Sequence, residues 1–132
     1  MGQHESVPVA FFIFSLDSGD VDVEPDMDTA SAAIEPQDVS IAEVVDDCGQ
    51  RYTPTTDGRV TVLVATGEVD RGALEARLRS SHEVAHLQIN DQDDFVLGFA
   101  DAAARWEWEH RWPRWPMWLD RRLHGTERRR YV

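Results

Sequence analysis

The 132-residue chain contains no lysine, and all thirteen of its basic residues are arginine. Against them stand 25 Asp and Glu residues, which give a formal net charge of −12 at pH 7. A body of this charge repels nucleic acid and anionic membrane, and it favours basic partners. We therefore expect no nucleic acid to bind through the acidic body, and we expect a protein partner with a basic or apolar surface.

The chain has a single cysteine, Cys48, which excludes an internal disulfide framework and fits a reducing, cytoplasmic location. The longest apolar run, residues 7–16, is about half as long as a membrane-spanning helix requires, so no membrane span is expected. The six residues before this run hold no Arg or Lys, so no secretory peptide is expected either. A Gly-rich phosphate loop is also missing.

The apolar fraction of 42% and the length predict one globular domain. Its charge is segregated along the chain. Residues 1–104 hold 5 Arg and 21 acids, whereas residues 105–132 hold 8 Arg and 4 acids. We expect an acidic α+β body over residues 1–111 and a Trp/Pro/Arg-rich extension of the same domain over 112–132, ending in a frayed basic tail from residue 126.

Hydrophobic patterns predict the elements of the body. Apolar, β-branched and aromatic runs at 7–16, 41–54 and 59–66 indicate strands, and Thr56-Asp57-Gly58 is typical of a hairpin turn. Valines 60, 62 and 64 alternate with other apolar or small residues, so both faces of that strand look buried. Helices are expected after Asp26 or Asp28, after Asp70 and over 91–110. With a further strand at 84–89, these elements predict an α+β fold with a mostly antiparallel four-stranded sheet and two main helices on one face.

The sequence His82-Glu83-Val84-Ala85-His86 has the pattern H-E-x-x-H. On a helix continuing through His86, the two imidazoles reach one zinc ion and Glu83 can activate its water. The pattern resembles the zincins, and the resemblance implies a third zinc ligand, often a Glu on the next helix. Glu107, 21 residues after His86, matches the spacing of the gluzincin branch. The resemblance therefore implies a minimal zinc metallopeptidase with Glu83 as catalytic base.

The flanks of this motif favour a different structure. Ser80-Ser81 is typical of a helix exit, and Ala85, Leu87 and Ile89 alternate with polar residues as in a half-buried strand. Side chains alternate across a strand, so Glu83 and His86 would point to opposite faces. On this interpretation there is no catalytic residue, metal ion or cofactor, and the zinc site is the alternative.

Two further segments are candidate binding surfaces. The acidic loop 17–28 lacks the Gly that a calcium-binding EF-hand requires at its sixth position, where Pro25 stands, so we interpret it as solvated or as a partner-binding surface. In the second segment, prolines 113 and 116 favour polyproline II geometry, which aligns indoles three residues apart. This stripe is either docked on the domain's own sheet, as we expect, or an interface. The candidate binding residues are Asp20, Asp22, Glu24, Asp26, Trp112, Arg114, Trp115 and Trp118.

The leading functional hypothesis is a non-enzymatic protein-interaction module. Charge segregation and the aromatic stripe favour it, and the sequence offers no coherent catalytic set outside the His82–His86 motif. Such a module can act as an inhibitor or immunity-type factor, or as a small component of a viral or cellular assembly. Homo-oligomer formation is left open.

Overall fold

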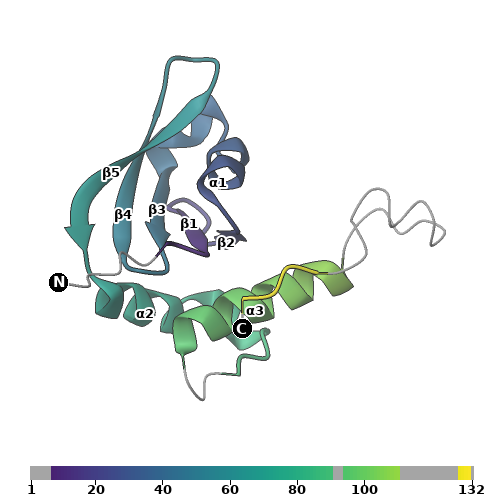
Figure 1. Cartoon of the computed structure of the whole chain (residues 1–132). Coiled ribbons are helices and arrows are strands. Elements are labelled where there is room, and N and C mark those ends of the chain that lie inside the picture. Colours follow the sequence, from purple (N-terminus) through teal and green to yellow (C-terminus); the bar gives the residue numbers. More distant parts are fainter. Residues whose placement is uncertain (1–6, 91–93, 111–127, 132) are drawn as a thin grey trace.

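The computed structural model describes residues 7–90, 94–110 and 128–131, and it shows an α+β fold built on an antiparallel sheet (Figure 1). Five strands lie in the order β2-β1-β3-β4-β5, and every neighbouring pair is antiparallel. They are β1 (Phe11–Ser15), β2 (Val21–Glu24), β3 (Ala42–Asp46), β4 (Gln50–Thr56) and β5 (Thr61–Val69). The helices are α1 (Met27–Ala33), α2 (Arg71–Arg79) and α3 (Phe95–Glu109), with 3-10 helices η1 (Pro36–Ile41) and η2 (His82–Ala85).

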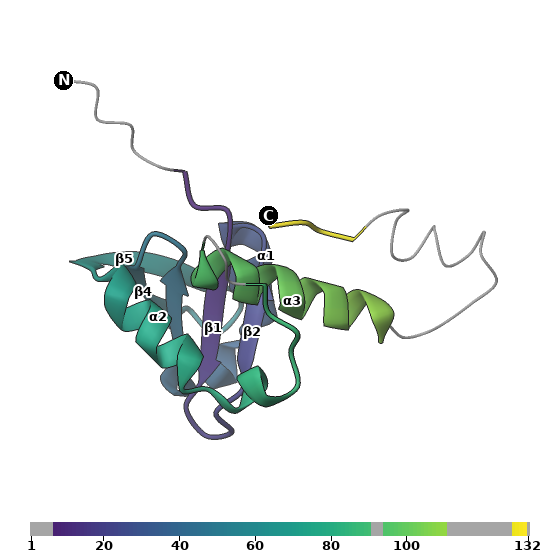
Figure 2. The same cartoon turned by 90° about the horizontal axis from the view of Figure 1, so that it is seen from below.

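Strand β1 is buried on both of its faces. Phe12 and Phe14 belong to a core cluster with α2 and α3, whereas Phe11 and Ile13 belong to a second cluster with α1. The sheet is therefore the middle layer, with α2 and α3 across one face (Figure 2) and α1 against the other. The α+β class, the antiparallel sheet and the two main helices on one face agree with the sequence prediction.

Aspartate side chains cap all three α-helices. The Asp26 carboxylate accepts a hydrogen bond from the Thr29 backbone N–H at 2.8 Å, and Asp70 accepts one from Ala73 at 2.9 Å. Such caps satisfy backbone donors that the first turn of a helix leaves unpaired. For α3 the cap is Asp94, which accepts from the Leu97 N–H at 3.2 Å. The caps of α1 and α2 are at predicted positions.

The sheet has five strands where the sequence predicted four. The predicted run 41–54 is divided by a turn at Gly49 into β3 and β4, and β2 lies inside the predicted acidic loop. Val21 and Val23 alternate with acids in β2, and Val23 is buried opposite Phe12 of β1. Two valines among acidic residues suffice for this short strand because β1 supplies both its hydrogen bonds and its apolar contact.

The predicted strand at 84–89 is wrong. Residues 82–85 form η2, and the following residues form no strand. Val84, Leu87 and Ile89 instead pack against the cluster of α2 and α3. The Asn90 backbone then lies against α3 at Gly98, where an added Cβ would overlap the Asn90 carbonyl. The apolar alternation therefore reflects packing on a helix rather than pairing in the sheet.

Residues Arg128–Tyr131 dock on α3 instead of forming the frayed tail that the sequence predicted. The Asp101 side chain, only 5% exposed, accepts hydrogen bonds from Arg128 Nη1 at 2.8 Å and from Arg128 Nη2 at 3.2 Å. It also accepts from the Tyr131 N–H at 3.1 Å, and Tyr131 is buried in the core cluster of α2 and α3. The rest of the predicted 112–132 extension lies outside the described residues.

We expect Asp101→Asn to lower the free energy of unfolding by about 2 kcal/mol near neutral pH, because the partly buried Arg128 guanidinium loses the negative charge with which it pairs. Burial raises the pKa of Asp101, but hydrogen bonds from Arg128 and the Tyr131 N–H outweigh it and hold this pKa below its ordinary value of 3.8. A carboxyl whose pKa is lower in the folded state than in the unfolded state stabilises the fold at pH values above its unfolded-state pKa. This stabilisation is lost as the pH falls through the folded-state pKa. The difference in the free energy of unfolding between wild type and Asp101→Asn, measured with urea, should therefore shrink below about pH 4. Asp17→Asn, at an exposed site, is the control, and equal losses in the two variants would contradict the prediction.

Two glycines with positive φ allow a matched test of the turn between β3 and β4. Gly49 (φ +91°) and Gly58 (φ +95°) have similar backbone conformations, but an added Cβ at Gly49 overlaps the backbone of Asp70 and Arg71. At Gly58 nothing lies within 4 Å. We expect Gly58→Ala to cost about 1 kcal/mol of backbone strain, and Gly49→Ala to cost roughly 1–3 kcal/mol more. Equal unfolding midpoints for the two variants would show that α2 does not depend on this contact.

Candidate functional site

A groove of about 510 Å³ lies where β2, η2 and α3 meet. In Figure 2, α3 crosses in front of β2, and the chain that follows α2 passes below both in the view. Several residues predicted for binding or catalysis line it: Asp20, Asp22, His82, Glu83, His86 and Glu107. Residues of the predicted acidic loop and of the H-E-x-x-H motif thus share one site.

At one end of the groove, two carboxylates meet a histidine. His82 Nε2 lies 3.0 Å from Asp20 Oδ1 and 3.4 Å from Glu83 Oε1. The potential ligand atoms of these three residues all lie within 4.8 Å of one another. The second Glu83 oxygen, Oε2, lies 3.3 Å from Nε2 of His86. Glu83 therefore connects the two histidines of the motif.

Backbone contacts hold both halves of this group. Asp20 ends the tight turn between β1 and β2, where the Ser15 N–H donates to the Asp20 carbonyl at 2.9 Å. The left-handed conformation of Gly19 (φ +77°) brings the turn against the His82 ring, 3.5 Å from the position of a Cβ. On the other side, Val84 of η2 packs partly into the core cluster of α2 and α3. The geometry of the group is thus fixed by elements that are themselves anchored.

The structure does not bring the predicted gluzincin ligands together in the predicted way. Helix α2 ends at Arg79, so the motif lies on η2 and its two histidines are not on one face of an α-helix. Glu107 lines the same groove, but it lies outside the group of ligand atoms that surrounds His82. Asp20 takes the place next to His82 that the resemblance gives to a glutamate of the next helix.

A second group, Asp46, Asp47 and Cys48, also brings potential ligand atoms within 4.8 Å of one another. Its carboxylates already accept backbone hydrogen bonds. Asp46 accepts from the Cys48 N–H at 2.9 Å and from the Tyr52 hydroxyl at 2.7 Å, and Asp47 accepts from the Val9 N–H at 2.8 Å. We interpret this group as a structural part of the turn after β3.

The candidate acidic residues of the loop have separate roles. Asp26 caps α1, Asp20 contacts His82, and Asp22 and Glu24 lie on β2 near Glu107 of α3. Burial raises the pKa of Glu24 to about 7, aided by the negative charges of Asp22 and Glu107. Burial and the charge of Asp22 also raise the pKa of Glu107. Carboxyl groups of β2 and α3 therefore lie close enough together to hinder one another's ionisation. Trp112, Arg114, Trp115 and Trp118 lie outside the described residues.

An apolar surface that the sequence did not predict lies on the β4–β5 hairpin. Val60, Val62 and Val64 were expected to be buried, yet their exposed fractions are 59%, 52% and 50%. Leu63, which points to the opposite face, is only 6% exposed. The core cluster under α2 and α3 contains residues of β1, β2 and β3 but none of β4 or β5. The helices thus leave this part of the sheet open; we call these three residues the valine face.

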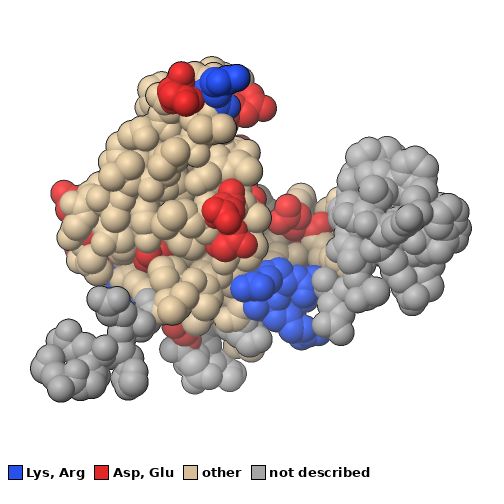
Figure 3. Space-filling model, turned by 45° about the horizontal axis from the view of Figure 1, so that its top comes forward, with Lys and Arg blue, Asp and Glu red and all other residues tan. Residues whose placement is uncertain are grey.

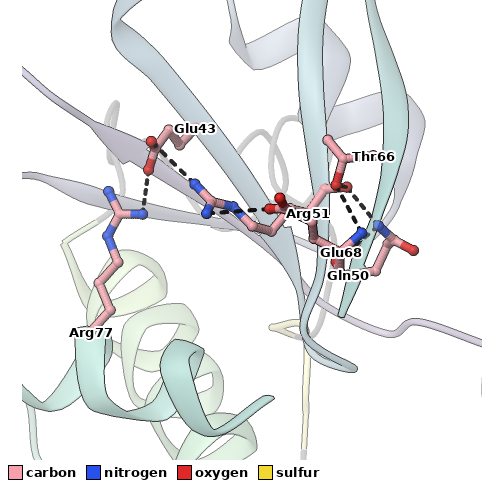
Figure 4. A network of polar contacts seen from close by, with 6 residues as sticks. All are labelled: Glu43, Gln50, Arg51, Thr66, Glu68 and Arg77. Atoms are coloured by element: carbon pink, nitrogen blue, oxygen red, sulfur yellow. Dashed lines mark hydrogen bonds and ion pairs between the residues drawn. The ribbon is translucent and has the colours of Figure 1, made fainter. Parts of the chain in front are cut away.

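A polar network links α2 to strands β3, β4 and β5 (Figure 4). Arg51 of β4 pairs with Glu43 of β3 at 3.3 Å and with Glu68 of β5 at 3.6 Å, and Glu43 also pairs with Arg77 of α2. These pairs join α2 to three strands. Figure 3 shows basic residues at the top of the molecule, flanked by acidic residues, and a larger basic group at the lower right, with further acidic residues and uncharged surface between the two.

The raised pKa of Glu24 predicts a pH dependence of stability. In the folded protein Glu24 keeps its proton up to about pH 7, whereas in the unfolded chain the same carboxyl releases its proton near pH 4.5. The free energy of unfolding therefore falls as the pH rises from about 4.5 to 7. We expect Glu24→Gln to remove that decline and to stabilise the protein by about 1 kcal/mol at alkaline pH, after allowance for solvent screening. Urea unfolding across this pH range checks it, with Glu35→Gln at an exposed site as control. Parallel pH profiles for Glu24→Gln and wild type would contradict the prediction.

The site thus combines a histidine–carboxylate group and an acidic groove at the β2 edge of the sheet with a valine face at the β5 edge. Among the described residues, no helix has both the length and the apolar character needed to cross a membrane. No family model matches the chain, and comparison with curated proteins and with solved structures finds no match either.

Proposed function

We propose that the chain is a non-enzymatic protein-interaction module, and that a basic protein docks on the valine face and the adjoining edge of β5. The observation that carries the proposal is the row formed by Val62 and Val64 on one face of the edge strand β5 and by Val60 just before it, each at least half exposed. Single exposed apolar residues are common on protein surfaces, but a contiguous row on an uncovered sheet face is typical of an interaction site.

The edge of β5 supports the same proposal. The strand is nine residues long, and among the described residues no strand pairs with its outer edge. Edge strands are usually protected from new pairing by charges, prolines or a covering element. The sequence 61-TVLVATG-67 has neither charge nor proline. A partner strand added here forms backbone hydrogen bonds with β5, and its alternate side chains pack beside Val62 and Val64.

Charge favours a different protein over a second copy of this chain. Two copies each carry a net charge of −12 and repel one another, whereas a basic partner is attracted over a distance set by the ionic strength. We therefore expect a basic protein that presents an aliphatic strand. A cytoplasmic inhibitor and a component of an assembly both fit this mode of binding. Further contacts through the acidic residues of 17–28 or through Trp112, Trp115 and Trp118 stay predictions.

The metallopeptidase alternative is less well supported. It requires a helix that carries His82 and His86 on one face towards a third ligand, Glu107, with Glu83 as base. Helix α2 ends at Arg79, and Glu83 contacts both histidines directly. The geometry therefore favours another role for this group.

The valine face can be tested with a shape-conserving variant. We expect the double variant Val62→Thr/Val64→Thr to fold like the wild type, because threonine keeps the β-branched shape that suits a strand. It should weaken the binding of the partner at least about tenfold, because apolar area at the interface becomes polar. Leu16→Thr is the matched control, since Leu16 and Val62 are both 52% exposed but lie on different surfaces.

The experiment has two stages. A protein captured from host extract is identified, purified and titrated by calorimetry against wild type, the double variant and Leu16→Thr at several salt concentrations. Support requires weaker binding by the double variant alone, a dissociation constant that rises with salt, and slower amide hydrogen exchange of residues 61–66 in the complex. Equal binding by all three proteins overturns the proposal. Self-association of the wild type that is lost in the double variant would show that a second copy is the occupant.

A further inference from the structure

Two carboxylate oxygens approach the same nitrogen atom of His82. Asp20 Oδ1 lies 3.0 Å and Glu83 Oε1 lies 3.4 Å from Nε2. This nitrogen carries either one N–H or one lone pair. A single N–H points well at only one of the two oxygens. With the lone pair on Nε2, three electron-rich atoms converge on a common point, and a cation at that point satisfies all three.

We propose that Asp20, His82 and Glu83 bind a zinc ion, with solvent as the remaining ligand. Zinc prefers four ligands in a tetrahedron, and imidazole nitrogen and carboxylate oxygen are among its usual donors. In a tetrahedron, bond lengths near 2.0–2.2 Å place neighbouring ligand atoms about 3.3–3.6 Å apart. The two measured separations, 3.0 and 3.4 Å, are close to this spacing, and the carboxylate oxygens of Asp20 and Glu83 lie within 4.8 Å of each other. A small rotation of exposed side chains completes the geometry.

His86 is a positioning residue for this site. Its Nε2 lies 3.3 Å from Glu83 Oε2, the oxygen that faces away from His82. A hydrogen bond from the imidazole to that oxygen orients the carboxylate so that Oε1 points to the metal position. Partners of this kind behind a metal ligand commonly tune its affinity. The site thus uses the H-E-x-x-H residues in an order different from the zincin pattern, with Glu83 as ligand instead of base.

The site is both held in place and accessible. The turn between β1 and β2 presents Asp20, and η2 presents His82 and Glu83, so a bound ion joins two segments that are 62 residues apart. The side chains of His82 and Asp20 are 51% and 64% exposed, which gives zinc a direct path from solvent. Binding therefore stabilises the folded state in proportion to the zinc concentration.

The inference is independent of the proposed function. The zinc group lies beside β2, whereas the valine face lies on β5, and these strands are the opposite edges of the sheet. The variant Val62→Thr/Val64→Thr should therefore bind zinc like the wild type. Failure of either proposal leaves the other intact.

The test is zinc titration of the full chain after chelator treatment, by calorimetry and by thermal unfolding. We expect stoichiometric binding by the wild type and a melting temperature that rises with zinc. His82→Ala and Asp20→Asn should each lower the affinity at least about tenfold and remove the thermal shift, while His86→Ala should lower it less. Glu107→Gln is the control, because it removes a carboxyl group from the same groove but leaves the three proposed ligands unchanged. Circular dichroism of the zinc-free variants verifies that each is folded.

Three results of these experiments would contradict the proposed zinc site or its ligands. Absence of stoichiometric zinc in the folded wild type overturns the proposal and leaves His82 Nε2 as a hydrogen-bonding partner of the two carboxylates. A loss of affinity in Glu107→Gln as large as in His82→Ala overturns the ligand assignment in favour of the gluzincin set. Cobalt substitution adds a spectroscopic check, since tetrahedral cobalt absorbs more strongly than octahedral cobalt, and a weak spectrum in the wild type contradicts the tetrahedral site.

Discussion

The two-sided burial of β1 is the constraint on which the rest of the structure depends. Its five residues supply Phe12 and Phe14 to one core cluster and Phe11 and Ile13 to the other. Burying an aromatic or large aliphatic side chain contributes on the order of 2 kcal/mol, so this short strand accounts for a large part of both layers. Because β1 also pairs with β2 and β3, any displacement of it moves both helical layers and both neighbouring strands.

The histidine–carboxylate group depends on the same strand. Asp20 lies in the turn that leaves β1, and η2 follows α2, which packs on the Phe14 side of β1, where the Arg77 guanidinium lies 3.9 Å from the Phe14 ring centroid. The two halves of the group are thus attached to one buried strand from opposite directions. The valine face is exposed because it lies away from β1. Helices α2 and α3 pack over the half of the sheet that contains β1 and leave the hairpin of β4 and β5 uncovered.

The sequence predicted those elements of the fold that depend on residues close together in the chain. The buried strand at β1, the hairpin turn at Thr56-Asp57-Gly58 and the aspartate caps of α1 and α2 each depend on residues within a few positions of one another. The errors arose where distant packing decides. Leu87 and Ile89 alternate like a strand but contact a helical layer, and β2 is formed by two valines that gain a partner only in β1.

In the candidate site, too, local patterns predicted some residues, and distant contacts determined the others. The motif identified His82, Glu83 and His86, because two histidines and a glutamate within five residues are conspicuous in any sequence. Asp20 was noted as acidic but not as a neighbour of His82, since 62 residues separate them and no local pattern links them. Alternation placed Val62 and Val64 on one face of a strand, but it could not tell whether a helix covers that face.

The pairing of Asp101 with Arg128 has a consequence for the order in which the chain can fold. During synthesis Asp101 of α3 is made 27 residues before Arg128, which donates two hydrogen bonds to its carboxylate. Until residues 128–131 are available, packing α3 on the sheet leaves the buried Asp101 carboxylate with only its 3.5 Å ion pair to Arg105, and it leaves the Tyr131 site unfilled. The cluster beneath α2 and α3 is therefore completed late, whereas the cluster beneath α1 contains only residues up to Leu63 and can form while the second half of the chain is still being made.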